Sequence, residues 1–324
     1  MYRPSHTLDE LKTAIAGGLI PAMPVMFDRG GRFHQRAHEA YVEFMSSQPI
    51  ASAAVWAHTG RGLLLDDETA CVVMEQWRQA LPDKPLIAGA GAKHSNPGQA
   101  TSATLSMASA AAKYGADALL VYPPRWLKDH EQRDSLIVEH HRQLAELGLP
   151  LVLFYLYEAA GGVCYTTEVL DELLGLTNVI GIKMATLDSV MTYQDIARHV
   201  QSRHPDKLLI TGEDRFLGYS LRRGAQTALI GMGAVCTDVQ TELMAAHFSG
   251  RAERFLELSD QVDQLAEVLF VQPMEGYIGR VLFALSQLGV IPVEAANDPW
   301  GPALTPHELD NITNVLNALN VQVG

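Results

Sequence analysis

Cysteine is scarce in this chain. Its 324 residues include three cysteines, Cys71, Cys164 and Cys236, which lie far apart and never form a CxxC pair. An odd number of widely spaced cysteines argues against a disulfide framework and against a structural zinc site. This usage is typical of proteins from a reducing compartment, and we therefore expect a cytoplasmic protein.

Positive charge and long apolar stretches are scarce as well. The formal net charge is −13, and no basic cluster is larger than the pair Arg222 and Arg223. A nucleic-acid-binding protein or one that adheres to anionic membranes would carry a basic patch. No apolar run reaches the roughly 18 residues of a membrane span, and residues 1–12 lack the apolar core of a signal peptide. The expected partner is therefore a small molecule, not a nucleic acid or a membrane.

Short apolar runs are abundant, and they alternate with longer segments of helical period. Their ends recur at roughly 30-residue intervals, the length of one strand, one crossover helix and two loops. Eight such units predict an α/β fold of the closed (β/α)8 TIM-barrel type. An open doubly wound sheet is disfavoured because the turn at 27–31 has no GxGxxG spacing. The eight runs are 20–27, 53–58, 86–91, 118–123, 149–157, 179–184, 208–212 and 228–235.

Residues 251–324 follow the predicted barrel of residues 1–250 and have helical character throughout. Residues 251–271 carry an apolar face, Pro273 begins a second helix that ends near Gly289, and residues 305–308 form a capping box with proline at N1. No flexible linker separates this part from the barrel. We expect a C-terminal helical extension that packs on the barrel or on a neighbouring subunit.

Lys183 lies at the end of the sixth apolar run, where a cation is unusual. A buried ammonium is costly, so burial favours the neutral amine, which is the nucleophile of Schiff-base chemistry. Catalytic groups of TIM barrels gather at the C-terminal ends of strands, which is where Lys183 lies. Strand alternation predicts that Lys183 points into the barrel above Gly181, whose missing side chain leaves room for the amine. It assigns Ile180, Ile182 and Met184 to the layer against the helices.

The fifth apolar run places two tyrosines near the same end of the barrel. Tyr155 and Tyr157 share one face of the predicted strand. A phenol close to a bound carbonyl group can donate and accept protons. We therefore predict that these tyrosines lie across from Lys183.

Six short motifs, in this order, resemble the dihydrodipicolinate synthase and N-acetylneuraminate lyase superfamily. The resemblance begins at about residue 15 and extends to the C-terminal helices. It implies a class I aldolase-type barrel that binds pyruvate or another 2-oxo acid as a lysine Schiff base, without a metal or organic cofactor. It also implies a homotetramer built as a dimer of dimers, or a homodimer. The motifs are GLIPAMP at 18–24, AHTG at 57–60, VYP at 121–123, LFY at 153–155, GIK at 181–183 and TGED at 211–214.

The resemblance assigns Lys183 as the Schiff-base lysine and Tyr155 as the proton-shuttling tyrosine. It assigns the loop after the second strand to the substrate carboxylate, and in that loop Thr59 and Gly60 match the family pattern. His58 and Arg61 depart from it. We predict His58 as a third catalytic residue, because an imidazole can both donate and accept protons near neutral pH. The predicted substrate-binding residues are Thr59, Gly60, Arg61, Tyr157 and Leu229.

Two further departures argue against dihydrodipicolinate synthase activity itself. The family's Asn-x-Pro-x-x-Arg segment is replaced by residues 156–160, so no arginine is available for the carboxylate of a second substrate. The fourth-strand motif continues into Arg125 and Trp126, where the synthases carry a tyrosine that reaches across the dimer. His58 and Arg61 together predict a substrate with more negative charge, or one held differently, than in the synthases.

The expected function is that of a Schiff-base lyase, aldolase or dehydratase acting on a 2-oxo acid or sugar acid. The sequence does not choose between cleavage, condensation and dehydration. Two alternatives remain open. A metal-dependent barrel hydrolase could use His58 with Glu213 and Asp214 as ligands. A barrel that has lost turnover could bind keto acids without reacting with them.

Overall fold

A computed structural model describes residues 6–93, 96–187 and 189–319. Eight parallel strands follow one another around a ring in which β1 pairs with β8, and a bridge between Ala22 and Ala54 joins β1 to β2. The predicted (β/α)8 barrel is therefore confirmed, with strands shorter than the apolar runs except for β6, which extends one residue further. The strands are β1 (Leu19–Pro21), β2 (Ala53–Val55), β3 (Leu86–Ala90), β4 (Ala118–Val121), β5 (Leu151–Leu156), β6 (Val179–Ala185), β7 (Leu208–Thr211) and β8 (Thr227–Ile230).

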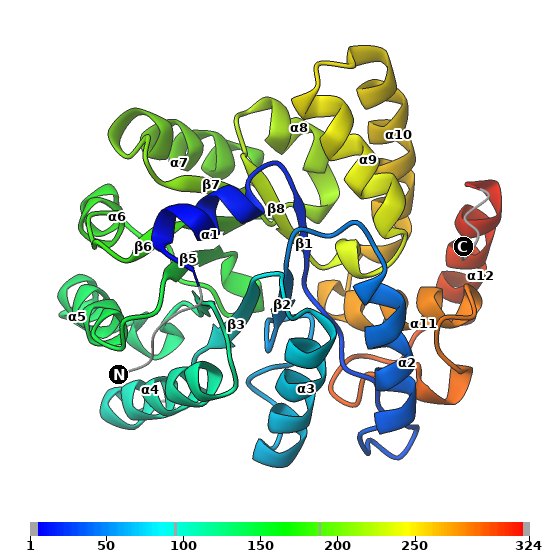
Figure 1. The fold of residues 1–324 in the computed structure, drawn as a ribbon, viewed down its shortest axis with the longest axis horizontal. Helices are drawn as coiled ribbons and strands as arrows, with labels where there is room; N and C mark the ends of the chain where they lie inside the picture. The colour runs from blue at the N-terminus through cyan, green and yellow to red at the C-terminus, as the bar shows by residue number, and fades with distance from the viewer. Residues whose placement is uncertain (1–5, 94–95, 188, 320–324) are drawn as a thin grey trace.

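Helices alternate with the strands and surround the barrel (Figure 1). Several begin at a side chain that accepts a backbone N–H of the first turn, as Asp66, Thr166 and Ser189 do. The barrel helices are α1 (Leu8–Ile15), α2 (Gln35–Ser46), α3 (Asp67–Ala80), α4 (Pro97–Lys113), α5 (Arg133–Ala145), α6 (Thr167–Leu174), α7 (Val190–Arg203), α8 (Leu217–Arg222) and α9 (Thr237–Phe248). Short 3-10 turns lie at η1 (Arg125–Leu127), η2 (Glu158–Ala160), η3 (Asp214–Phe216), η4 (Met232–Ala234), η5 (Met274–Gly276) and η6 (Val293–Ala295).

The apolar core has two layers because side chains alternate along each strand. In β5, Val152, Phe154 and Leu156 belong to the cluster inside the barrel. Leu153 and Tyr155 belong to the larger cluster between the strands and the helices. Helix α1 lies across the N-terminal end of the barrel (Figure 1), and its buried side chains join the interior cluster.

A β-bulge between β5 and β6 changes the predicted faces of β6. The pairing steps from Leu151 with Val179 to Val152 with Gly181, so Ile180 is the extra residue. Ile180 consequently lies inside the barrel, not against the helices as predicted. The prediction that Gly181 leaves room for the Lys183 amine was also wrong. A Cβ there would lie 2.3 Å from the carbonyl oxygen of Leu208, so Gly181 permits close strand approach rather than making room for the amine.

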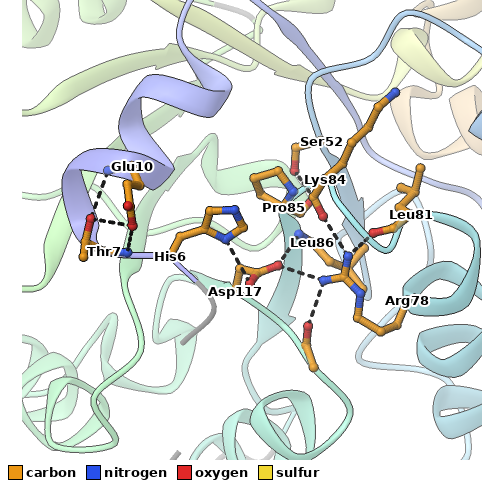
Figure 2. Close-up of polar contacts among 11 residues, drawn as sticks. His6, Thr7, Glu10, Ser52, Arg78, Leu81, Lys84, Pro85, Leu86 and Asp117 are labelled. Carbon is orange, nitrogen blue, oxygen red and sulfur yellow. Dashed lines mark hydrogen bonds and ion pairs between the residues drawn. The ribbon is translucent and has the colours of Figure 1, made fainter. Parts of the chain in front are cut away.

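A polar network lies at the N-terminal end of the barrel, beside the starts of β3 and β4 (Figure 2). The buried carboxylate of Asp117 accepts a hydrogen bond from Arg78 at 2.9 Å and another from the backbone N–H of Leu86 at 2.9 Å. Arg78 also donates to the carbonyl oxygens of Leu81 and Lys84. One guanidinium thereby joins the end of α3 to the starts of β3 and β4.

The C-terminal extension contains α10 (Ala252–Leu269), α11 (Tyr277–Gln287) and α12 (Pro306–Ala318). Helix α10 packs on α8 and α9, and α12 packs on α10 and α11. The predicted capping box between Thr305 and Glu308 is present, and Gly289 has the positive φ of 73° expected just after a helix end. The predicted boundary at residue 250 between the barrel and the extension stays a prediction. Residues 1–5 of the predicted barrel and 320–324 of the predicted extension lie outside the described residues.

Of the helices in the described ranges, none is by itself long and apolar enough to cross a membrane. Helix α10 passes that test only when it is joined to the segment Met274–Gln287, from which a bend of 105° separates it.

Candidate active site

A small cavity lies at the C-terminal ends of the strands, and Lys183 lines it. Its other walls come from the loop after β2, from the ends of β5 to β8 and from the C-terminal extension. The lining residues are His58, Thr59, Phe154, Leu156, Tyr157, Lys183, Ala185, Leu187, Gly212, Asp214, Gly231, Phe270 and Tyr277. Residues separated by more than 200 positions therefore meet around one amine.

The side chain of Lys183 is enclosed by apolar neighbours. It is 6% exposed, and its Nζ lies 4.2 Å from the centre of the Phe154 ring. A Cβ at position 212 would lie 2.6 Å from Lys183 Cε, so Gly212 provides the space that was predicted for Gly181. Burial lowers the pKa of Lys183 to about 8, and the carboxylates of Asp214 and Glu213 oppose this shift. A substantial fraction of the amine is therefore neutral at physiological pH.

Two acidic residues follow β7, and both are buried. Glu213 accepts hydrogen bonds from the backbone and hydroxyl of Thr186 and from the backbone of Leu187. Asp214 accepts the backbone N–H of Met232 at 2.7 Å and lines the cavity. Burial raises the pKa of each carboxyl group to about 7. Glu213 thus fixes the loop after β6, whereas Asp214 is placed to hold or release a proton near the amine.

The loop after β2 presents His58 and Thr59 to the cavity through a tight backbone path. Trp56 and Arg61 have positive φ values of 53° and 51°. A Cβ at Gly62 would lie 1.8 Å from the carbonyl oxygen of Trp56, so only glycine fits there. These constraints hold the loop in one shape.

His58 and Thr59 share a hydrogen-bond partner from the C-terminal extension. The hydroxyl oxygen of Tyr277 lies 3.1 Å from His58 Nδ1 and 3.0 Å from Thr59 Oγ1. Burial lowers the pKa of His58 to about 4, so the imidazole is neutral at physiological pH. Burial raises the pKa of Tyr277 well above its usual value, so the phenol keeps its proton. Sequence reasoning placed Tyr277 on a helix but did not connect it to the site.

Arg61 does not extend into the cavity as a free cation. Its guanidinium pairs with Glu275 at 2.8 Å and with Asp298 at 2.6 Å, both in the segments beyond α10. Because these carboxylates neutralise it, Arg61 gives no support for the predicted substrate of higher negative charge. Its role in the described structure is to join the β2 loop to the C-terminal extension.

The structure corrects the predicted position of Tyr155. Its ring packs outside the barrel against Tyr165, with the centroids 5.9 Å apart, and it belongs to the outer cluster. Phe154 takes the interior position beside Lys183. The prediction that Tyr155 faces Lys183 is therefore wrong, because the register places even-numbered residues of β5 inside. Tyr157 lies past the end of β5 and does line the cavity.

The other predicted substrate-binding residues are distributed differently. Thr59 lines the small cavity, whereas Gly60 approaches the backbone just after β1, since a Cβ there would lie 2.6 Å from the carbonyl oxygen of Met23. Leu229 is fully buried in the interior cluster and lines neither this cavity nor the wider one beside it. Leu229 therefore fills the barrel core, contrary to its prediction as a substrate contact.

A wider cavity of about 500 Å³ adjoins the small one, and His58 and Leu156 line both. Most of its wall is apolar or aromatic, and its cationic side chains are Arg61, Lys93 and Arg125. The apolar and aromatic part of the wall is formed by Leu63, Leu64, Ala92, Tyr122, Pro123, Trp126, Leu156 and Ala160. This cavity can accept an organic group attached to a molecule bound at Lys183.

The hydrolase alternative required His58, Glu213 and Asp214 to share a metal ion. Within the described part of the chain, these three do not form a group with ligand atoms close enough to hold one. The group that does is Asp171, His199 and His204, where one carboxylate oxygen of Asp171 lies 2.8 and 2.6 Å from the two imidazoles. It lies on α6 and at the end of α7, outside the cavity that contains Lys183. The geometry predicted for the hydrolase is therefore absent.

Comparison with known proteins gives one consistent picture. The model of the dihydrodipicolinate synthetase family matches residues 15–319. A 4-hydroxy-tetrahydrodipicolinate synthase of Bartonella tribocorum is 24% identical over 277 residues, covering 84% of this chain and 88% of that protein. The corresponding synthase of a Chelativorans species is 28% identical over 281 residues, with 84% and 88% covered.

Solved structures agree in fold. A monomeric dihydrodipicolinate synthase variant superposes with a TM-score of 0.81 at 23% identity, covering 94% of this chain and 97% of that one. N-acetylneuraminate lyase from Mycoplasma synoviae gives 0.76 at 19% identity, with 96% and 99% covered. A prophage protein of the dihydrodipicolinic acid synthase family from E. coli, solved in complex with pyruvate, gives 0.81 at 20% identity, with 94% and 98% covered.

Proposed function

Because this chain belongs to the dihydrodipicolinate synthetase family, whose members are lyases, we propose that it is a Schiff-base lyase for a 2-oxo acid. The observation that carries the proposal is Lys183, a buried lysine with a lowered pKa at the C-terminal end of β6 that opens onto a cavity. Its neutral amine attacks the ketone carbon and forms an iminium. That iminium accepts electrons when a neighbouring carbon–carbon bond breaks or a β-leaving group departs. No metal or organic cofactor is needed for this step.

The wider cavity supports a substrate that carries an apolar or aromatic group. A sugar acid exposes many hydroxyl groups, each of which loses hydrogen bonds to water in an apolar site. The wall offers Leu63, Leu64 and Trp126 to such a substituent, together with two further cations, Lys93 and Arg125. We therefore favour a 2-oxo acid with an apolar substituent over the sugar acid that the sequence left open.

Thr59 is the predicted carboxylate contact that the geometry supports best. The backbone N–H groups of Gly60 and Arg61 already donate to Ala57 and His58. The hydroxyl of Thr59 lines the small cavity beside Lys183. In this proposal Thr59 orients the keto acid, Tyr157 and Leu156 enclose it, and Gly60 shapes the loop.

Borohydride trapping tests the proposal directly. Wild-type protein is incubated with pyruvate, 2-oxobutanoate, 2-oxo-4-phenylbutanoate and 2-keto-3-deoxygluconate, reduced, and analysed by peptide mass spectrometry. We expect an adduct on Lys183, formed fastest with the phenyl compound, and none in Lys183→Arg. Absence of any adduct on Lys183 with all four acids would reject the Schiff-base mechanism. A preference for the sugar acid would reject the apolar substrate.

A binding protein without turnover is the second candidate, and Phe154 favours it. Phe154 puts no hydroxyl where the family resemblance implies a proton shuttle. Such a protein would form the Lys183 adduct or bind the acid, yet release no cleaved or dehydrated product. Product analysis by mass spectrometry on the trapped acids separates the two candidates.

We further propose a homotetramer, as a dimer of dimers, or a homodimer, within a reducing cytoplasm. Family resemblance supports the assembly, although one structural relative is a monomeric variant. Cys71, Cys164 and Cys236 are unpaired thiols, which agrees with a reducing compartment. Light scattering after size exclusion should give four or two times the chain mass of 35.4 kDa. A mass equal to one chain would contradict the assembly.

A further inference from the structure

Phe154 places no proton donor or acceptor on β5 opposite Lys183. Its ring, 4.2 Å from Lys183 Nζ, occupies the position on β5 that faces the amine, and it cannot exchange a proton. The phenol of the adjacent residue, Tyr155, lies in the outer layer. Imine formation nevertheless requires a proton to reach the ketone oxygen before that oxygen leaves as water. Another acid must therefore lie near Lys183.

Tyr277 lies where such an acid is needed. It is 6% exposed and lines the same small cavity as Lys183. The ring stacks with Phe270, with centroids 4.7 Å apart, and with His58, at 6.0 Å. Gly231 keeps this space open, because a Cβ there would lie 2.9 Å from Tyr277 Cε2. The hydroxyl is thus fixed in place, not free to rotate into solvent.

The hydrogen bonds around Tyr277 form a chain that reaches from the cavity to a carboxylate. His58 Nε2 lies 3.4 Å from Glu275 Oε1, which favours the tautomer with its proton on Nε2. Nδ1 is then an acceptor, and the Tyr277 hydroxyl donates to it at 3.1 Å. Thr59 Oγ1 can in turn donate its one proton to Tyr277 at 3.0 Å, until a substrate carboxylate takes that hydrogen bond. The side chain of Glu275 is 40% exposed, so this series of hydrogen bonds reaches solvent.

We propose that Tyr277, supplied by the C-terminal extension, is the proton-transfer residue of the Lys183 imine, with His58 as its relay to solvent. This inference rests on the proposed Schiff-base function. Lys183 Nζ bonds to the ketone carbon, and one amine proton moves through Tyr277 to the oxygen, which gives a neutral carbinolamine. Tyr277 then donates a second proton, the carbon–oxygen bond breaks, and water leaves an iminium. That proton leaves with the water, so Tyr277 is left as a tyrosinate; His58 then takes up a new proton from solvent and gives the proton on its Nδ1 to Tyr277.

Tyr277→Phe tests this role, because it removes the hydroxyl and keeps the ring packing. The readout is the rate of borohydride-trapped pyruvate adduct on Lys183. We expect that rate to fall about 100-fold or more, within the range of general acid catalysis. The equilibrium amount of adduct after long incubation should change little, because the acid alters the barrier and not the product. Tyr219→Phe, a partly exposed tyrosine of α8, is the matched control and should react at the wild-type rate.

A second variant separates chemistry from packing. Phe154→Tyr in the Tyr277→Phe background places a phenol on β5 facing the amine. The double variant should form the trapped adduct at least tenfold faster than Tyr277→Phe alone. Labelling of Lys183 by trinitrobenzenesulfonate should be the same in wild type and Tyr277→Phe. If Tyr277→Phe also loses this labelling, Tyr277 is a packing residue and the proposal is wrong.

The Tyr277 proposal can fail while the Schiff-base function stands. An adduct that forms on Lys183 at the wild-type rate in Tyr277→Phe would overturn the role of Tyr277 alone. If adduct formation slows in Tyr155→Phe but not in Tyr277→Phe, the proton-transfer residue is Tyr155 of β5 and not Tyr277. No Lys183 adduct in wild-type protein with any acid would instead reject the function itself.

Discussion

At the scale of single residues, the reactivity of Lys183 depends on a balance between burial and two acids. Burial lowers its pKa to about 8, and Asp214 is the strongest opposing influence. At pH 7 about a tenth of such an amine is neutral. The rate of imine formation should therefore rise about tenfold per pH unit below 8 and level off above it.

Asp214→Asn should shift this profile toward lower pH. The carboxylate stabilises the ammonium, so its removal leaves Glu213 as the remaining carboxylate that opposes burial, and the pKa of Lys183 falls further. The substitution is nearly isosteric, and its amide oxygen can still accept the Met232 N–H. The pH dependence of Lys183 labelling by trinitrobenzenesulfonate measures the midpoint. Asp206→Asn, an exposed acid near β7, is the control, and a midpoint at or above that of wild type would contradict the argument.

Gly212→Ala should impair the same amine by crowding. The added methyl group would lie 2.6 Å from Lys183 Cε and 2.8 Å from the Met184 carbonyl oxygen. Overpacking of this kind costs about 1 to 3 kcal/mol and displaces the more flexible partner, which here is the lysine. We expect pyruvate trapping to slow at least roughly tenfold. Gly98→Ala, where the nearest atom lies 3.6 Å away, should trap at the normal rate, and equal rates in both variants would disprove the crowding.

Residue identity alone could predict Lys183 as a site residue, but it could not predict which side chains of β5 face it. A lysine in an apolar strand is a signal that survives small errors of register, because burial perturbs it whichever face it takes. Tyr155 gave no such signal. Residues 151–157 are apolar or aromatic at nearly every position, so the pattern fixes which side chains share a face but not which face is inside. The structure puts Phe154 inside, and only the packing of the whole barrel decides this.

At the scale of elements, the β2 loop and the C-terminal extension act as one unit through Arg61. Arg61 pairs with Glu275 and with Asp298, whose side chain is only 3% exposed. The loop carries His58, and the extension carries Tyr277. The ion pairs therefore hold together the two halves of the proposed proton chain.

Arg61→Met should destabilise the fold and slow the chemistry together. Removing one partner of a buried ion pair leaves an unpaired charge and costs about 3 kcal/mol. The free energy of unfolding in urea and the trapping rate should both fall. Lys128→Met, which breaks the exposed pair with Glu158, should cost less than about 1 kcal/mol. A loss for Arg61→Met no larger than for Lys128→Met would refute the coupling.

Sequence patterns predicted most elements because period and capping are local properties. The eight strands, the apolar face of α10 and the capping box of α12 all follow from residues within a few positions of one another. The bulge at Ile180 does not, because it depends on how β5 and β6 pair. Tyr277 was missed for a similar reason: it lies in a helix 94 positions after Lys183, and only tertiary packing brings the two to one cavity.

At the scale of the whole molecule, the two ends of the barrel differ in role: the C-terminal end holds the candidate active site, and the N-terminal end holds a structural ion pair. The C-terminal end gathers a buried amine, two acids of raised pKa and glycines that make space. The N-terminal end is closed by α1 and holds the network of Asp117, which Figure 2 shows. The apolar interior cluster fills the barrel between these two ends.

Arg78→Met tests this separation. It removes the guanidinium from the fully buried Asp117 carboxylate, which keeps the Leu86 N–H and His6 Nδ1, at 3.4 Å, as partners, and we expect a loss of about 3 kcal/mol in unfolding free energy. Because Arg78 lies at the opposite end of the barrel from Lys183, the pyruvate trapping rate of the folded protein should stay within about twofold of wild type. The double variant Arg78→Met/Asp117→Asn removes the buried charge that has lost its guanidinium, while the amide oxygen at position 117 can still accept the Leu86 N–H. It should therefore be more stable than Arg78→Met alone, which a double-mutant cycle measures. A trapping rate that falls in step with stability would mean that the two ends of the barrel are coupled.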